Sequence, residues 1–140
     1  MNRFEFTSRD KRIKVVISVY KTPGPMRKAY TKCSGDQACE NTQGGASTHL
    51  IVDYKKGKRP FRRTESYIFL HRKWCTYGVV AHEINHIAHH LAKYHPRPGI
   101  SAEELRCSFL DTLVDLFMPL FLKHRIIHTK RESYHSFTGT

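Results

Sequence analysis

Residues 76–93 read TYGVVAHEINHIAHHLAK, and this stretch decides how the second half of the chain folds. At about 100° per residue, a helix over this range separates its aliphatic side chains from most of its histidines. The aliphatic face consists of Val80, Ile84, Ile87 and Leu91. The opposite face consists of His82, His86, His89 and Lys93. The sequence therefore predicts an amphipathic helix that packs on a core and turns its histidines away from it. A third flank of alanines offers close packing to another element: Ala81, Ala88 and Ala92.

Beyond this helix, the sequence predicts a second helix that folds back along the first. Residues 95–99 read HPRPG, a combination of proline and glycine that breaks a helix. Ser101 is a good N-cap, so the second helix should begin there and run to about Met118. Pro119 should end or kink it, and residues 120–128 should form a further short helix.

The first half of the chain predicts strands. Three stretches rich in β-branched and aromatic residues are 12–20 (RIKVVISVY), 48–54 (THLIVDY) and 66–71 (SYIFLH). Residues 21–46 hold several prolines and glycines and predict a long loop, and residues 55–63 predict a basic turn. The expected fold is α+β, with a small three-stranded sheet, antiparallel or mixed, beside the two helices. We expect one domain over residues 1–128 and a polar tail over 129–140.

The balance of charge points to an acidic partner. The chain has 140 residues, and its 39% hydrophobic and 26% charged residues are typical of one ordered globular domain. Its formal net charge is +12 and its pI is about 9.8. Nucleic acid is the commonest partner of so basic a protein. The alternative is a surface whose charge serves only to keep the protein solvated.

Targeting signals and cysteine usage predict a cytoplasmic protein. The opening residues lack the apolar stretch of a secretion signal, and no uncharged apolar run of membrane-spanning length exists. We therefore expect no membrane contact and four reduced cysteines: Cys33, Cys39, Cys75 and Cys107. Five residues separate Cys33 from Cys39, which favours free thiols in a loop over a metal site.

The pentapeptide His82-Glu83-Ile84-Asn85-His86 carries the clearest chemical signal. Two histidines four apart on a helix share a face and can bind one Zn²⁺, while the glutamate between them can reach a metal-bound water. This pattern predicts a zinc-dependent hydrolase with Glu83 as general base. In a chain with 10 His, the pattern arises by chance in about 3% of shuffled sequences. The alternative is a solvated, histidine-rich helix face.

A third metal ligand is expected from the second helix. The pattern HExxHxxGxxH is absent, since His89 stands at its glycine position and Ala92 at its last histidine. Glu103 and Glu104 follow His86 by 17 and 18 residues, and a helical hairpin would bring them back toward the first helix. We favour Glu104 over Glu103, with Asp111 or Asp115 orienting a histidine. The alternative is that Glu104 only completes a capping box with Ser101.

A family resemblance covers residues 66–117, SYIFLHRKWCTYGVVAHEINHIAHHLAKYHPRPGISAEELRCSFLDTLVDLF. This run resembles the core of small metallopeptidases encoded by phages and prophages. In those proteins a strand, a spacer and AHExxH lead through a glycine-containing loop to a helix that opens EEA. They in turn resemble gluzincins, in which the helix after HExxH supplies a glutamate ligand. The HExxH motif is the only highly specific part of the match.

The resemblance implies a minimal zincin-like fold and a Zn²⁺ cofactor held by His82, His86 and Glu104, with Glu83 as base. It implies a protein or peptide substrate that pairs along strand 66–71 as the sheet edge. A phage-encoded enzyme of this kind would act in the host cell cytoplasm. The chain departs from the family pattern in two places: Leu105 follows the acidic pair in place of alanine, and the proline expected after the strand is absent.

A basic cluster supports a second hypothesis. It lies within residues 55–63 and consists of Lys55, Lys56, Lys58, Arg59, Arg62 and Arg63. Such a cluster can grip phosphates, although a solvated hairpin loop is the commoner explanation. On this hypothesis the protein binds nucleic acid or an acidic protein, and its zinc site is vestigial or structural.

Overall fold

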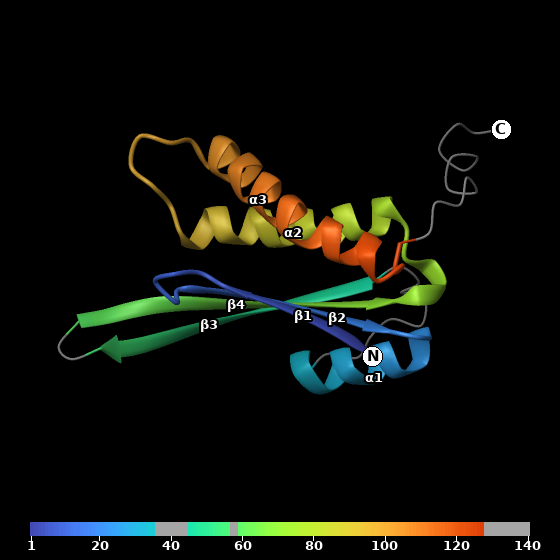
Figure 1. The fold of residues 1–140 in the computed structure, drawn as a ribbon. Coiled ribbons are helices and arrows are strands. Elements are labelled where there is room, and N and C mark those ends of the chain that lie inside the picture. Colours follow the sequence, from blue (N-terminus) through green and yellow to red (C-terminus); the bar gives the residue numbers. More distant parts are fainter. Residues whose placement is uncertain (36–44, 57–58, 128–140) are drawn as a thin grey trace.

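The structure, a computed structural model, describes residues 1–35, 45–56 and 59–127, with the backbone alone for 52–56 and 59–61. Its sheet has four strands: β1 (Asn2–Thr7), β2 (Ile13–Tyr20), β3 (Gly45–Lys56) and β4 (Arg59–His71). Its helices are α1 (Pro23–Ser34), the short 3₁₀ turn η1 (Arg72–Trp74), α2 (Tyr77–Tyr94) and α3 (Ala102–Lys123). The strand order is β1-β2-β4-β3, so β1 and β3 are the two edges (Figure 1).

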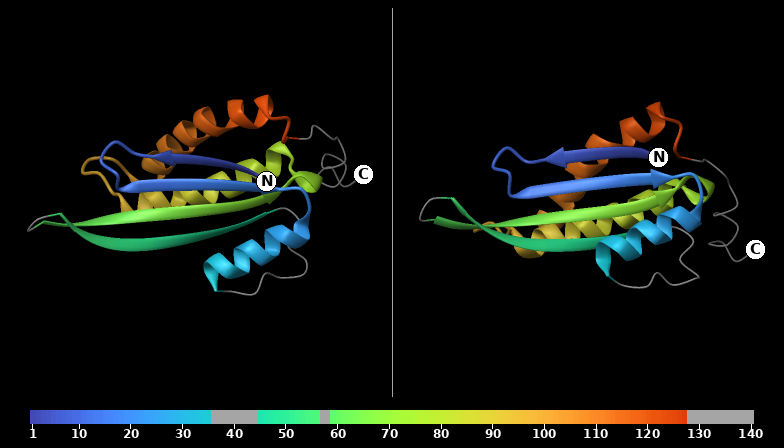
Figure 2. Two further views of the ribbon diagram at one scale, coloured as in Figure 1. Left: turned by 60° about the horizontal axis from the view of Figure 1, so that its bottom comes forward. Right: turned by 90° about the horizontal axis from the view of Figure 1, so that it is seen from below.

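The sheet is mixed. β1 pairs antiparallel with β2, β2 parallel with β4, and β4 antiparallel with β3. The parallel step needs a crossover, which α1 provides between β2 and the β3–β4 hairpin. Figure 2 shows α2 and α3 on one face of the sheet and α1 on the other.

The core lies between the sheet and the α2–α3 hairpin. Alternate residues of β2 and β4, such as Ile17 and Leu70, are fully buried on this face. Phe117 and Phe121 of α3 pack against it, with their ring centroids 6.3 Å apart. The same core also contains Val15, Val19, Ile68, Val80, Ile84, Ile87, Leu91 and Leu113. On the other face of the sheet, Met26 of α1 is fully buried.

Both long helices begin where the sequence predicts. The Thr76 side chain accepts a hydrogen bond from the Val79 backbone at 3.2 Å, and Ser101 accepts one from the Glu104 backbone at 3.1 Å. Each bond satisfies one of the free N–H groups at a helix start. The aliphatic face of α2 is buried as expected, and so are Ala88 and Ala92 of its alanine flank. Ala81 is exposed.

The α+β class and the mixed sheet are confirmed, but the sheet has four strands instead of three. The strand that the sequence analysis missed is β1, NRFEFT, which alternates polar residues with Phe4 and Phe6. Phe4 is buried and packs on Phe121 at a ring distance of 5.4 Å. This long-range contact, more than local strand propensity, fixes β1 against the core.

The long loop predicted over residues 21–46 is wrong in its first part, which forms α1. Its prolines and glycine mark the ends of a helix and not a loop. Pro23 is the first residue of the helix, where the backbone needs no N–H donor. Gly35 follows the last helical residue in the left-handed conformation, at φ 79°. Cys33 therefore lies in a helix, and Cys39 falls outside the described residues.

Two other predicted boundaries are wrong. The basic turn over residues 55–63 is mostly strand, because β3 runs to Lys56 and β4 begins at Arg59. The second helix does not end at Met118: α3 continues through Pro119 to Lys123, so no separate helix follows. Phe121 explains this continuation, since its burial beneath α3 offsets the lost backbone bond at Pro119. The predicted tail, 129–140, lies outside the described residues. No helix in the described ranges is long and apolar enough to cross a membrane.

Candidate metal centre

The two histidines of the HExxH motif point at a common position beside α2. His82 and His86 are both exposed, and their Nε2 atoms are 3.1 Å apart. Two nitrogens bound at about 2.0–2.1 Å to one tetrahedral ion lie about 3.3–3.4 Å apart. The pair is therefore already close to the spacing that a shared zinc ion requires. The same spacing also allows an N–H···N hydrogen bond between the two rings.

Glu83 lies beside this pair but faces the sheet. Its side chain is 6% exposed and accepts a hydrogen bond from the Ser47 hydroxyl of β3. Burial raises the pKa of the Glu83 carboxyl, while His82, His86 and the Ser47 hydroxyl act to lower it. The Oε2 atom is buried without a hydrogen-bond partner among the described residues. A half-satisfied buried carboxylate of raised basicity next to two exposed imidazoles suits a group that takes up a proton.

Gly45 gives Glu83 its place against β3. A Cβ at this position would lie 2.9 Å from Cδ2 of Leu70, 3.1 Å from the Phe69 carbonyl oxygen and 3.3 Å from Cγ of Glu83. The first two distances are shorter than ordinary contacts, and one involves backbone. The absent side chain therefore lets the strand and the helix approach closely at the motif.

The third ligand expected from α3 is not brought to the histidine pair. Among the described residues, no three His, Cys, Asp or Glu side chains lie close enough together to hold a metal ion. Glu104 is exposed in the first turn of α3, where its backbone N–H is capped by Ser101. Glu103 lines a shallow hollow between α2 and α3, together with His89, Ala92, Lys93, Ala102 and Arg106. In this geometry Glu103 lies beside α2 at His89.

Other residues of α3 fix how that helix lies beside the motif. Arg106 donates a hydrogen bond from Nη1 to Oδ1 of Asn85, inside the HExxH segment, at 2.9 Å. Leu105 is 3% exposed, so its side chain is buried, whereas His82 and His86 are exposed. Asp111 and Asp115 are exposed. The leucine at position 105, where the resembling proteins have alanine, therefore causes no steric conflict at His82 and His86.

Strand β3 contributes site residues that the sequence analysis missed. Ser47 meets Glu83, and His49 stacks on His90 of α2 with ring centroids 4.0 Å apart. His49 also shares a 3.0 Å hydrogen bond between Nδ1 and the Ser66 Oγ of β4. Burial, with His90 and His86 nearby, lowers the pKa of His49 to about 4, so its ring is neutral at pH 7. Gly45, Ser47 and His49 alternate along β3 and therefore lie on one face of the sheet. Their position beside α2 follows only from the strand register, which the sequence does not show.

The predicted substrate edge is wrong. Residues 66–71 belong to β4, which lies between β2 and β3 and has both edges paired. The edge strand beside α2 is β3, the strand that carries Ser47 and His49. The side chains of Lys55, Lys56, Lys58 and Arg59 lie outside what the structure describes. Arg62 is exposed, and Arg63 forms a 3.3 Å ion pair with Glu65.

Comparison of the chain with protein-family models, with curated proteins and with solved structures finds no match in any of the three.

Proposed function

We propose that this protein is a zinc-dependent hydrolase with a zincin-like site on α2, and that its substrates are peptides or proteins. The observation that carries the proposal is the 3.1 Å approach of the His82 and His86 Nε2 atoms beside the buried carboxylate of Glu83. Two imidazoles one helical turn apart and an adjacent base are the protein groups that metal-assisted hydrolysis needs.

In this proposal His82 and His86 hold the ion, and a carboxylate at the start of α3, which lies apart from the pair in this structure, would move in to complete its protein ligands. Glu104 is the residue that the family resemblance favours, and Glu103 is the one whose side chain lines the α2–α3 hollow. A zinc ion held there would polarise the scissile carbonyl and lower the pKa of a water molecule. Exposure of both histidines leaves room for solvent and substrate, as a catalytic site requires.

Glu83 acts as the base that takes the proton from the attacking water. The pKa of the Glu83 carboxyl is raised, which moves it toward neutral pH. A general base that must later release its proton works best when its pKa is near the pH at which the enzyme operates. The Ser47 hydroxyl holds the carboxyl toward β3, and Gly45 leaves the space for it. The proton then passes from Glu83 to the leaving amine, so the carboxylate is restored at the end of the cycle.

The test compares the wild type with Glu83→Gln on a quenched fluorescent peptide library, with zinc content measured in parallel. The amide keeps the shape of the carboxyl but cannot accept a proton. We expect hydrolysis to fall by about 10²- to 10⁴-fold with zinc content unchanged. Glu5→Gln is a matched control, because it alters an exposed carboxyl on β1. Equal hydrolysis by the wild type and Glu83→Gln would remove Glu83 from the mechanism.

A purely structural zinc ion makes a different prediction. Its removal by a chelator would unfold the protein, since structural zinc supplies folding free energy. The exposed position of the histidine pair, on the side of α2 away from the core, predicts instead that the chelated protein keeps its circular dichroism and loses only hydrolysis.

A further inference from the structure

Three segments far apart in the sequence meet at one end of the sheet, around Thr64. This residue is fully buried at the point where β4 first pairs with β2. Its backbone N–H donates to the Arg12 carbonyl at 2.8 Å, and its Oγ1 lies 2.8 Å from Nε2 of His95, at the end of α2. Figures 1 and 2 show the β1–β2 turn, the β3–β4 hairpin and the α2–α3 connection at this same end.

Positive charge gathers on all three segments. The exposed cations of this end, which we call the basic end, are Arg9, Lys11, Arg12, Arg62 and Arg97. Among the acidic side chains that the structure describes at this end, Asp10 accepts hydrogen bonds from the Ser8 hydroxyl and the Arg12 backbone, and Glu65 pairs with Arg63 at 3.3 Å. The sequence alone indicates only the part of this charge that lies within residues 55–63. The turn and the α2–α3 connection join it through the fold.

The shape of this end also narrows the partner. Residues 59–63 of β4 pair with β3 alone, because the pairing of β4 with β2 begins at Thr64. The hairpin therefore extends past the sheet as a two-stranded ribbon (Figure 1). The backbones of Lys55, Lys56 and Arg59 continue along this ribbon. A two-stranded β-ribbon is one of the two protein shapes that the major groove of DNA admits.

We propose that the basic end binds duplex DNA, with the ribbon directed into the major groove and the β1–β2 turn against the phosphate backbone. Charge complementarity supplies the affinity, and the ribbon supplies the fit. This activity is separate from the proposed hydrolase, since Arg9, Lys11 and Arg12 take no part in the His82–His86 site.

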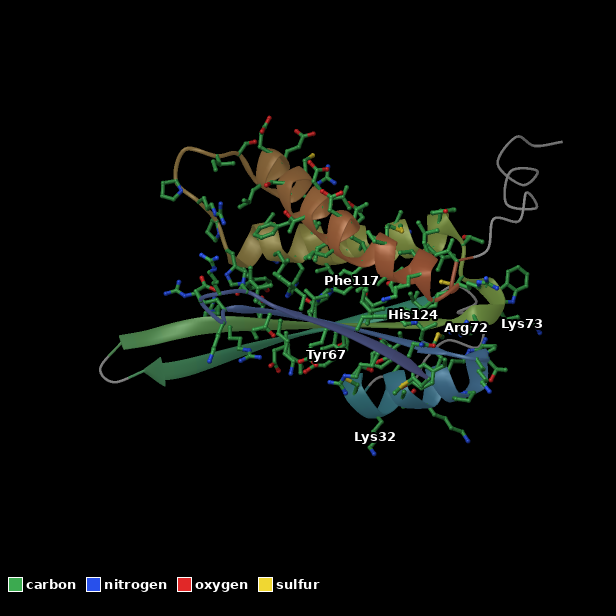
Figure 3. All side chains as sticks on the ribbon, viewed as in Figure 1. Lys32, Tyr67, Arg72, Lys73, Phe117 and His124 are labelled. Atoms are coloured by element: carbon green, nitrogen blue, oxygen red, sulfur yellow. The ribbon has the colours of Figure 1, made fainter. Side chains whose placement is uncertain are left out.

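The experiment measures fluorescence anisotropy of a labelled duplex of about 20 base pairs over a range of salt concentrations. The test variant is the triple substitution Arg9→Gln, Lys11→Gln and Arg12→Gln. The control variant removes the same charge elsewhere: Lys28→Gln, Lys32→Gln and Lys73→Gln. Lys32 and Lys73 project from α1 and from η1, away from the basic end (Figure 3).

We expect the test variant to bind the duplex about tenfold or more weakly at low salt, and its slope of log affinity against log salt to fall by about 2–3. The control variant should stay within about threefold of the wild type. Equal losses in the two variants would overturn the proposal, because the binding would then follow net charge alone. Glu83→Gln should bind DNA as the wild type does.

A second variant and two other anionic partners complete the experiment. If the triple variant loses its thermal unfolding transition, Arg62→Gln with Arg97→Gln removes charge from the other two segments and should weaken binding in the same direction. Anionic lipid vesicles and polyglutamate are offered in place of DNA. Failure to bind duplex at low salt, or tighter binding to vesicles or polyglutamate than to duplex, would overturn the choice of partner.

Discussion

Two groups of histidines lie along α2 and β3, and the fold holds them in opposite ways. The exposed pair, His82 and His86, turns both Nε2 atoms to one point in solvent. The sheltered group, His49, His90 and His95, lies between α2 and the sheet, where burial lowers the pKa of each ring. In the proposed function the exposed pair holds the metal ion, whereas the sheltered group is neutral packing against the sheet.

This contrast shows that position around the helix decides whether a histidine is exposed or sheltered. His86 and His90 are one helical turn apart, yet His90 is turned toward β3 and stacks on His49. Two of the sheltered rings have hydroxyl partners, Ser66 for His49 and Thr64 for His95, whereas Nε2 of His90 is buried without a hydrogen-bond partner among the described residues. We therefore expect substitutions in the exposed pair to affect metal binding and those in the sheltered group to affect stability.

The largest expected effect is on zinc affinity in the exposed pair. His82→Ala or His86→Ala removes a proposed direct ligand, so zinc affinity should fall by more than the roughly 10- to 100-fold cost of losing an outer-shell partner. Stability of the metal-free protein should change by less than about 0.5 kcal/mol, because both side chains are exposed. Competition with a fluorescent chelator gives the affinity and urea unfolding the stability. His89→Ala, an exposed histidine of the same helix, should retain zinc, and zinc loss in that variant would place the site elsewhere.

The reverse pattern is expected for His49→Ala. This change takes a hydrogen-bond partner from the fully buried Ser66 and removes the stack on His90, so it should destabilise the protein by about 1–3 kcal/mol. Zinc affinity should stay within tenfold of the wild type in this account. Urea unfolding at neutral pH measures the first quantity. A stable His49→Ala protein that no longer binds zinc would make His49 a ligand and break the distinction.

The pH dependence of stability offers a finer comparison. Because the pKa of His49 falls from 6.5 to about 4 on folding, the unfolded chain binds more protons between these values. Stability of the metal-free protein should therefore fall as the pH drops from about 6.5 to 4. The raised pKa of Glu83 acts with the opposite sign, so Glu83→Gln should steepen this fall and His49→Gln should flatten it. Unfolding free energies that stay level in both variants would contradict the burial of these groups.

The smallest expected effect comes from Arg106→Gln. Its hydrogen bond to Asn85 ties α3 to the motif but lies at the surface, so stability should fall by only about 0.5–1.5 kcal/mol. If a carboxylate of α3 completes the metal site, zinc affinity should fall several-fold as well. Unchanged affinity would indicate that the first turn of α3 does not depend on this contact for its position.

Much of the fold around the motif could be predicted from sequence, because local patterns determine it. The faces of α2, its start near Thr76, the cap at Ser101 and three of the four strands follow from periodicity and from residues that begin or end helices. What failed depends on distant contacts. β1 is fixed by Phe4 against Phe121, and α1 was hidden by prolines that occupy a helix's first turn.

The candidate site divides in the same way. The spacing of His82, Glu83 and His86 along one helix could be recognised from the sequence alone. Ser47, His49 and Gly45 meet α2 through strand register, which a single sequence does not reveal. The basic end is similar, because Arg12 and Arg62 become neighbours through the pairing of Ile13 with Thr64. Whether Glu103 or Glu104 points toward α2 depends on the rotation of α3 about its own axis. Neighbouring residues of a helix differ in direction by about 100°, and a single sequence does not determine that rotation.

The most direct measurement is a crystal structure of the zinc-loaded protein with anomalous diffraction recorded at the zinc absorption edge. We predict one strong peak beside α2, at about 2.0–2.1 Å from the Nε2 atoms of both His82 and His86, with Glu83 next to it but not bound. A peak at other residues, or none at this pair in crystals grown with excess zinc, would contradict this prediction.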